Sequence, residues 1–225
     1  MPNKDKKLVL VGAGELAEIA YEYFTYDSEY EVVAFSVEQK FIDADSLHGL
    51  PIVPLEEIEE HFPVDDYKIF VAIPSTQLNR LRARLYLQLK EQGYKFATYI
   101  SSKAFVWRNA EIGENCFIFE NNVIQPFVQI GNNCILWSGN HVGHRTVIED
   151  HCFLSSHVVI SGYCRIGHSS FLGVNATFND NTSIANSCIL GSASLVNKPL
   201  IEPESIYIGS PARKVEGRTS LKVKL

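Results

Sequence analysis

The sequence contains no run of about 18 apolar residues, the length that a membrane-spanning helix needs. Its first residues, MPNKDKKLVLVGAG, lack the apolar core and the small-residue cleavage site of a signal peptide. Basic residues are not in excess either, since 20 Lys and Arg face 26 Asp and Glu, for a net charge of −6. An acidic chain is a poor ligand for phosphate backbones. We therefore expect a cytoplasmic protein without a membrane span or a nucleic-acid partner.

Cysteine pairs with the spacing of a redox or zinc motif are missing as well. The five cysteines are odd in number, and no C-x-x-C occurs. This pattern favours a reducing compartment over a disulfide framework. The chain is nevertheless 46% hydrophobic and 20% charged, which excludes intrinsic disorder and leaves enough apolar side chains for a sizeable core.

Charge is scarce in the middle of the chain. Residues 1–103 carry 17 acidic and 11 basic side chains, whereas residues 104–199 carry only 6 and 4. Residues 200–225 carry 3 acidic and 5 basic side chains. The composition break near residue 103 predicts a domain boundary.

Strands alternate with helices in the pattern of residues 1–103. This alternation predicts a small α/β domain with a parallel, Rossmann-like sheet. The expected strands are 7–11, 31–37, 67–73 and 96–100, and the expected helices are 15–24, 55–61 and 75–92.

Residues 104–199 divide into sixteen hexads without remainder, from AFVWRN to SLVNKP. The third position is apolar in every hexad, which at this composition has a chance on the order of one in a hundred thousand to a million. The first position is mostly small and holds all five cysteines, which we interpret as small buried side chains. The fourth position is glycine in six hexads.

A period of six fits neither an α-helix nor a simply alternating strand. It predicts a coil in which each short strand ends at a corner, with a large aliphatic side chain inside and a small residue near the bend. Glycine is expected to relieve the backbone where the coil turns. Three hexads per coil give roughly five coils, whose inward side chains, each worth roughly 1.5–3 kcal/mol when buried, form one narrow core.

These repeats resemble those of the hexapeptide-repeat acyltransferases, which build a left-handed parallel β-helix. The segment Gly209-Ser210-Pro211-Ala212-Arg213-Lys214, written GSPARK, looks like the G-x-P-A-[KR] signature that follows the helix in many acetyl-CoA-dependent members. The whole layout is similar to the sialic acid O-acetyltransferase and bacillosamine N-acetyltransferase family. The resemblance covers nearly the entire chain and implies three parts: a nucleotide-sugar-binding domain at 1–103, a β-helix at 104–199 and a tail at 200–225.

Five of the seven histidines fall within the hexads. The stretch from His144 to Gly162 aligns without a gap with the family's segment that begins at the catalytic histidine, so the resemblance implies that His144 is the general base. His141 is the alternative in the same hexad. The other three, which we expect to be solvated corner residues, are His151, His157 and His168.

An imidazole suits this role, because an amine or hydroxyl that attacks a thioester must lose a proton near neutral pH. The family places a carboxylate directly after the histidine, where it raises the basicity, but residue 145 of this chain is arginine. An arginine cannot accept the ring N–H. The partner expected in its place is His141, Asn140, Glu149, Asp150 or a backbone carbonyl.

A zinc site is the other reading of these histidines, because γ-class carbonic anhydrases share the implied fold. Their site needs a further histidine about two coils upstream of a close pair. No histidine lies between His61 and His141, so we expect no metal.

The resemblance also implies that acetyl-CoA, as co-substrate, lies in a groove between two subunits of a homotrimer. The family has histidine where Phe153 stands. Arg213 and Lys214 are placed to meet the phosphates of the coenzyme. The other matching positions are Phe153, Gly162, Val174 and Ser192.

A second binding surface is expected near the N-terminus. Gly12, Ala13, Gly14 and Glu15 follow a strand and open a helix, a geometry in which backbone amides capture phosphate. The resemblance implies a nucleotide-linked sugar here, with further contacts at 36–38 and 74–75. Glu38 is expected to take a ribose hydroxyl, and Pro74 stands where the family has glycine.

The sequence thus predicts an acetyl-CoA-dependent acetyltransferase that acts on the amino group of a nucleotide-activated sugar for surface glycan or polysaccharide assembly. One alternative is O-acetylation of a free or lipid-linked sugar, with the first domain as a spacer. The other is a non-catalytic hexapeptide-repeat subunit that serves as an assembly surface.

Overall fold

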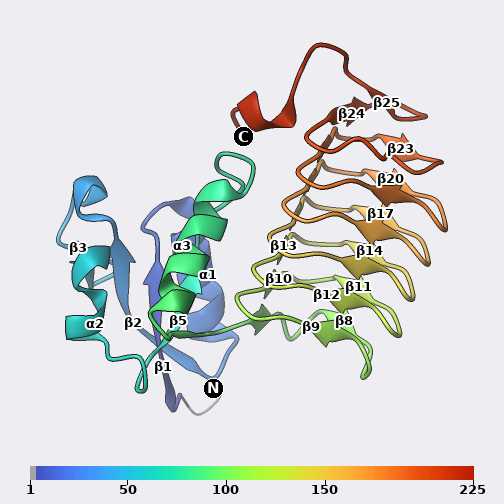
Figure 1. The fold of residues 1–225 in the computed structure, drawn as a ribbon. Coiled ribbons are helices and arrows are strands. Elements are labelled where there is room, and N and C mark those ends of the chain that lie inside the picture. The colour runs from blue at the N-terminus through green and yellow to red at the C-terminus, as the bar shows by residue number, and fades with distance from the viewer. Residues whose placement is uncertain (1–3) are drawn as a thin grey trace. The chain divides into compact units, whose positions relative to one another are not determined.

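The computed structural model describes residues 4–225, and their packing divides the chain into two units. The first comprises residues up to Pro74 together with Arg84–Tyr99, and the second comprises Ser75–Ala83 together with Ile100–Leu225. Each unit contains sheets of its own (Figure 1). Among residues 4–225, none of the helices combines the length and the apolar character that crossing a bilayer requires.

The first unit is built on a six-stranded sheet in the order β3-β4-β2-β1-β5-β6. Its strands run parallel except for β3, which is antiparallel to β4. The central strand β1 is buried from Leu8 to Val11, as its unbroken apolar run requires. The strands are β1 (Lys6–Val11), β2 (Tyr30–Val37), β3 (Ser46–Leu47), β4 (Leu50–Pro54), β5 (Lys68–Val71) and β6 (Lys95–Phe96).

Three α-helices accompany this sheet, and the first packs on β1 and β2. They are α1 (Glu15–Tyr26), α2 (Ile58–His61) and α3 (Arg80–Glu91), with short 3-10 turns at Gln39–Phe41 and Leu55–Glu57. The helix expected from residue 75 begins only at Arg80, because Gln77, Leu78 and Asn79 have left-handed φ angles of 55°, 53° and 63°. The prediction of its start was therefore wrong.

The strand expected at 96–100 was also wrong as a single element. The chain divides there into Lys95–Phe96, which pairs with β5, and β7 (Tyr99–Ile100), which is the end strand of a different sheet. The β3–β4 hairpin was not expected either, since a strand of two residues carries no periodic pattern that sequence analysis could detect.

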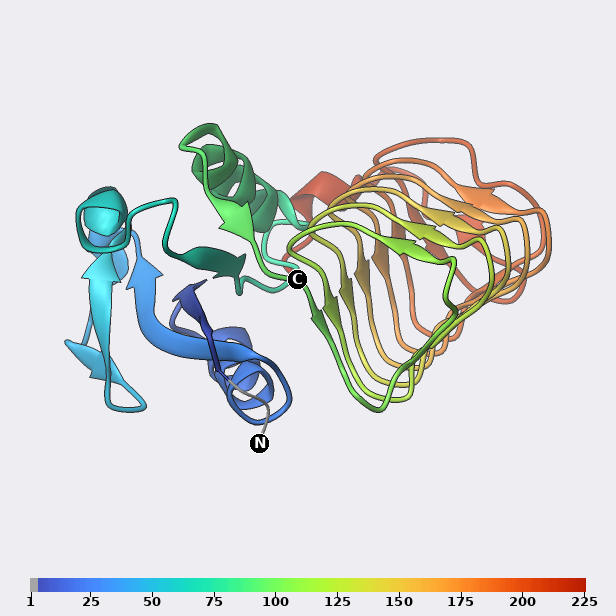
Figure 2. The ribbon, with the colours of Figure 1, turned by 90° about the horizontal axis from the view of Figure 1, so that it is seen from below.

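The second unit is a parallel β-helix. Each two-residue strand occupies the second and third positions of a hexad and pairs in parallel with the strand 18 residues further on, as β11 does with β14 and β14 with β17. Viewed in Figure 2, the coils superpose as a triangle. The predicted coil of three hexads per turn is confirmed.

Three sheets form the faces of this triangle. The first face contains β7, β10 (Phe117–Ile118), β13 (Ile135–Leu136), β16 (Phe153–Leu154), β19 (Phe171–Leu172), β22 (Ile189–Leu190), β24 (Ile206–Ile208) and β25 (Arg213–Lys214). The second face contains β8 (Phe105–Val106), β11 (Val123–Ile124), β14 (His141–Val142), β17 (Val159–Ile160), β20 (Thr177–Phe178) and β23 (Leu195–Val196). The third contains β9 (Glu111–Ile112), β12 (Gln129–Ile130), β15 (Val147–Ile148), β18 (Arg165–Ile166) and β21 (Ser183–Ile184).

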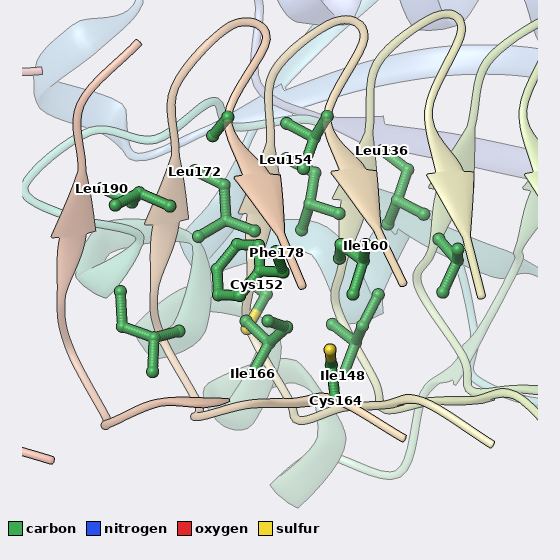
Figure 3. Close-up of a cluster of buried hydrophobic side chains, with 14 of the residues drawn as sticks. Leu136, Ile148, Cys152, Leu154, Ile160, Cys164, Ile166, Leu172, Phe178 and Leu190 are labelled. Carbon is green, nitrogen blue, oxygen red and sulfur yellow. The ribbon is translucent and has the colours of Figure 1, made fainter. Parts of the chain in front are cut away.

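Third-position side chains fill the interior of the coils, as Figure 3 shows for Leu136, Ile148 and Leu154. The five cysteines are buried free thiols beside them, which confirms their interpretation as small core residues. Burial raises the pKa of the Cys188 thiol to about 11, so this thiol is neutral at physiological pH.

The corners turn at the sixth position of each hexad. From Asn115 to Ala193 every residue at this position has a left-handed φ, between 54° and 64° apart from Gly139 at 78°. Asparagine, which tolerates this conformation, recurs there. The expectation that glycine relieves the turn is therefore wrong. The glycines at the fourth position instead allow adjacent coils to pack closely. A Cβ on Gly173, for example, would lie 2.6 Å from the backbone nitrogen of Ser192 in the next coil.

The C-terminal segment continues the first face. β24 pairs with β22 in parallel, and β25 returns antiparallel to β24, so the GSPARK segment forms a hairpin turn at the end of the β-helix. Tyr207 and Ala212 join its core, and the Ser210–Pro211 peptide is cis. A final 3-10 turn covers Ser220–Lys222.

Residues 75–83 are fastened to the β-helix by one buried cation. The guanidinium of Arg82 donates to the carbonyls of Asn133, His151 and Cys152 at 3.3, 3.1 and 3.3 Å. It also donates to Oδ1 of Asn79 at 3.1 Å. Burial lowers the pKa of Arg82 to about 10, which leaves it charged at neutral pH.

We expect Arg82→Ala to lower the free energy of unfolding by about 3–5 kcal/mol, because several buried carbonyl groups lose their donor. Chemical denaturation measures the change. The matched control is Arg80→Ala in the same helix, since Arg80 is exposed and its bonds to the carbonyls of Gln77 and Leu221 lie at the surface, so that its loss costs about 1 kcal/mol or less. Equal stability of the Arg82 variant and the wild type would falsify this account.

Candidate functional site

His144 stands at the corner that joins the second face to the third. We call this place the His144 corner and define it as residues 125–127, 143–145, 161–163 and 179–181, which stack in successive coils. The imidazole is exposed there, at the fifth position of its hexad, while His141 lies half-buried on β14. The structure thus places the two predicted candidates on adjoining parts of the surface.

The partner of the His144 ring is Gln125 in the preceding coil. Oε1 of Gln125 accepts the backbone N–H of His144 at 2.9 Å and lies 3.3 Å from Nδ1 of its ring. Gln125 was not predicted from the sequence, because this residue lies 19 positions before His144 and outside its hexad. The 18-residue coil period is the signal that could have identified Gln125. The residue one coil before His144 is residue 126, and Gln125 directly precedes it.

The partners expected from the sequence lie elsewhere. Asn140 turns inward, where it donates to the carbonyl of Trp137 and accepts from the N–H of Val158. Glu149 and Asp150 follow β15 at the next corner, where they accept the backbone N–H groups of His168 and Asn132. The contact of Nδ1 with Gln125 therefore replaces these expectations.

Gly162 leaves room for the imidazole. A Cβ on this residue would lie 2.6 Å from Cε1 and 2.8 Å from Nε2 of His144. The ring of Tyr163 meets the imidazole edge-on, with centroids 5.2 Å apart. Arg145, which stands where the family has a carboxylate, places its guanidinium 4.5 Å from the ring centroid of Phe127.

The remaining corner histidines differ in their surroundings. His157 and His168 are exposed, as predicted, but His151 is half-buried. The amide of Asn133 faces its Nδ1 at 2.9 Å, and burial lowers the pKa of His151 below its ordinary value. Residues 4–225 contain no group of three or more His, Cys, Asp or Glu side chains that could hold a metal ion.

The residues expected to bind the coenzyme do not form one cluster within the chain. Val174 and Ser192 are exposed at the corner that precedes the second face, whereas Gly162 lies at the His144 corner that follows it. Phe153 is only 7% exposed and stacks on Phe171 with centroids 5.4 Å apart. It therefore offers little surface to a ligand.

The two basic residues of the GSPARK segment lie side by side on β25. Arg213 is exposed, and one of its Nη atoms donates to the carbonyl of Ala212. Lys214 forms an ion pair with Glu202, and this contact raises the pKa of its ammonium group. Arg213 is thus the more available of the two for a phosphate.

The N-terminal residues expected to bind a nucleotide do come together, at the carboxyl ends of three adjacent strands. Gly12 to Glu15 follow β1 and open α1, while Glu38 follows β2 and Pro74 comes after β5. Gly12 needs its φ of 123°, and a Cβ there would lie 2.8 Å from the carbonyl oxygen of Ala72. Helix α1 begins after Gly14 without a side-chain cap.

Glu38 is already engaged in this unit. Its carboxylate accepts from Arg84 at 3.0 Å and lies 3.7 Å from the ammonium group of Lys40. Sequence reasoning missed Arg84, because nothing in a helical pattern shows that this residue faces a strand end 46 positions earlier.

The comparisons with known proteins agree on the fold. The model of the GMPPB C-terminal domain matches residues 95–206. The acetyltransferase domain of PglB from Neisseria gonorrhoeae is 21% identical and superposes with a TM-score of 0.83 over 94% of this chain and 100% of its own. A single-residue variant of perosamine N-acetyltransferase from Caulobacter crescentus, solved with CoA and GDP-perosamine, is 24% identical and has a TM-score of 0.83 over 94% of this chain and 97% of its own.

A third solved structure, WeeI from Acinetobacter baumannii, is 20% identical and has a TM-score of 0.78 over 93% of this chain and 100% of its own. The PglB domain has also been solved with acetyl coenzyme A. No curated protein matches the sequence. The stacked parallel strands agree with the left-handed β-helix that the resemblance implied, and the chain has the fold of the hexapeptide-repeat sugar N-acetyltransferases.

We expect Gly162→Ala to displace the imidazole of His144 from Gln125, because the new Cβ meets the movable end of a side chain rather than backbone. The ring ¹⁵N resonances of His144 then change, while the melting temperature stays within a few degrees. In the matched control, Gly173→Ala, the Cβ meets backbone instead, and stability falls by about 1–3 kcal/mol. Unchanged His144 resonances would contradict the packing described here.

We also expect the free energy of unfolding to fall as the pH is lowered through the range in which an exposed histidine titrates. The unfolded chain takes up a proton on His151 that the folded chain resists, so acid favours unfolding. His151→Asn, which suits the left-handed corner, flattens this pH dependence in denaturant titrations. His157→Asn is the matched control at an exposed corner, and it leaves the pH dependence of the free energy of unfolding as it is in the wild type.

Proposed function

We propose that this chain transfers an acetyl group from acetyl-CoA to the amino group of a nucleotide-linked sugar, in the assembly of a surface glycan. The observation that carries the proposal is the exposed His144, with Nδ1 bonded to Gln125, in a fold shared over 94% of the chain with an enzyme solved with CoA and GDP-perosamine. The GSPARK turn supports it, because Arg213 offers an exposed cation for a phosphate.

In this proposal Nε2 of His144 takes the proton of the attacking amine while the new N–C bond forms. The imidazolium then gives the proton to the sulfur of CoA as the thioester C–S bond breaks. The transfer is direct and leaves no acyl group on the protein. Since the five thiols are buried in the β-helix core, none of them is placed to compete as a nucleophile.

We further propose a homotrimer. The His144 corner and the corner with Val174 and Ser192 border opposite edges of the second face, so one chain cannot close a coenzyme groove with both. In a trimer the His144 corner of one subunit faces the other corner of its neighbour. The nucleotide is held by Gly12 to Glu15, with Glu38 and Pro74 beside it, in a site where Arg84 supplies a positive charge.

The test is release of CoA thiol from acetyl-CoA with a panel of nucleotide-linked amino sugars. We expect turnover on at least one of them, and a fall of about 10²–10⁴-fold in kcat for His144→Ala. His168→Ala is the matched control, since His168 is exposed at the same position of another hexad, and it retains the wild-type rate.

Each contrary outcome identifies a different error. Turnover only on free or lipid-linked sugars would replace N-acetylation with O-acetylation and make the first unit a spacer. If His141→Ala rather than His144→Ala abolished turnover, the base would be His141. Lack of acetyl-CoA binding by calorimetry would favour a non-catalytic assembly subunit.

A further inference from the structure

We infer that Gln125 is a positioning residue that fixes His144 in the tautomer with the proton on Nδ1, so that Nε2 is free to accept a proton. This inference rests on the proposed role of His144 as the base. The observation behind it is the position of Oε1 of Gln125, which lies within hydrogen-bond distance of both the backbone nitrogen and Nδ1 of His144.

The backbone amide decides which end of the Gln125 side chain faces His144. A backbone N–H is always a donor, so the atom 2.9 Å from it must be the amide oxygen and not the amide nitrogen. The same oxygen then faces Nδ1 at 3.3 Å, and because an oxygen of this kind can only accept, Nδ1 must carry a proton. In a neutral imidazole this leaves the lone pair on Nε2.

The position of Gln125 is itself fixed by the coil. Its backbone N–H donates to the carbonyl of Val142 at 3.0 Å, and the N–H of Arg145 donates to the carbonyl of Pro126 at 3.1 Å. The residue before a proline is also restricted to extended backbone. The acceptor is therefore held between two backbone bonds that join its coil to the coil of His144.

The residue one coil after His144 is Gly162, which offers no side-chain acceptor to the backbone N–H of His144. Elsewhere in the β-helix a side chain one coil further on accepts the fifth-position N–H: Asn132 accepts that of Glu114 and Asp150 that of Asn132, and within the His144 corner Asp180 accepts that of Gly162. Gly162 has no side chain to do this for His144. It removes the usual acceptor and at the same time makes the space that the imidazole occupies.

A second histidine of the same chain provides the comparison. His168 has the same hexad position, and its backbone N–H donates to Glu149, which stands in the same relation to it as Gln125 to His144. The Nδ1 of His168, however, faces Oγ of Ser169 at 3.3 Å, and Glu149 forms an ion pair with Arg165. Of these two histidines, His144 alone has one acceptor for both its backbone N–H and its ring.

Besides His144, the charged and titratable side chains of the His144 corner are those of Arg145, Tyr163 and Asp180, and Asp180 accepts the N–H of Gly162. The neutral amide of Gln125 orients the imidazole of His144 without adding a negative charge beside it. A carboxylate in its place would also stabilise the imidazolium form.

The experiment compares Gln125→Met and Gln125→Glu with the wild type. ¹⁵N-histidine labelling reads the tautomer of His144 without any acetyl transfer, so this readout stands even if no sugar is turned over. We expect an Nδ1-protonated ring in the wild type and in Gln125→Glu, and a mixture with the Nε2-protonated form in Gln125→Met, which has no comparable acceptor.

Kinetics provide the second readout. Gln125→Met lowers kcat by about 10–100-fold with little change in the KM for acetyl-CoA, because orientation and not coenzyme binding is lost. Gln125→Glu, unlike Gln125→Met, keeps the wild-type rate, and it moves the acidic limb of the pH–rate profile to higher pH. Glu149→Met, the matched control at His168, changes neither the rate nor the His144 tautomer.

The inference is overturned by a wild-type His144 protonated on Nε2, or by a Gln125→Met variant that keeps both the wild-type tautomer and rate. Loss of rate with an unchanged tautomer and a lower melting temperature overturns it too, because it assigns Gln125 a structural role alone. If the wild type shows no turnover but Gln125→Met shifts the tautomer of His144, the positioning role of Gln125 is supported and the proposed reaction is rejected.

Discussion

The second unit depends on one backbone constraint, the left-handed residue that turns the chain at the end of fourteen successive hexads. Thirteen non-glycine residues and Gly139 adopt this conformation in succession between Asn115 and Ala193. Each pays a small conformational cost, which is offset because the turn brings the next strand into register with its partner 18 residues away. Backbone N–H and C=O groups then pair from coil to coil, and the inward side chains stack into one core.

The same constraint arranges side chains in columns, and the candidate site is a local variation in one of them. The column at the His144 corner combines an amide acceptor before the histidine with a glycine after it. The left-handed residue at this corner, Arg145, has a φ of 57°, within the range of the other non-glycine corner residues. The chemistry of this corner is therefore set by a few side chains on a scaffold that the remaining hexads maintain.

The β-helix could be predicted from the sequence, because a period of six with an apolar third position is a property of many residues at once. The parallel sheet of the first unit was predictable for the same reason. The start of α3 was not, since it depends on Asn79 and Arg82, whose bonds are made with carbonyls 51 to 91 residues further on. A pattern of local periodicity contains no information about such distant partners.

The candidate site was predictable as a location but not as a set of contacts. The hexad pattern predicted the location of His144, but the residues near it in sequence, such as Arg145 and Glu149, are not the partners of its ring. Gln125 and Gly162 become neighbours of His144 only when residues are compared at intervals close to 18. The buried state of Phe153 was likewise invisible, because the outward positions of a strand look alike until the face they share is known.

The pairing of strands at intervals of 18 also limits how a chain of this kind can change its length. Removing one hexad between His144 and Gly162 would carry every later residue to the adjacent face, so that a different side chain would stand beside the imidazole. Inserting three further hexads together after Ala193 would leave each column intact and alter only the height of the stack. The β-helix can therefore grow by whole coils without disturbing its chemistry.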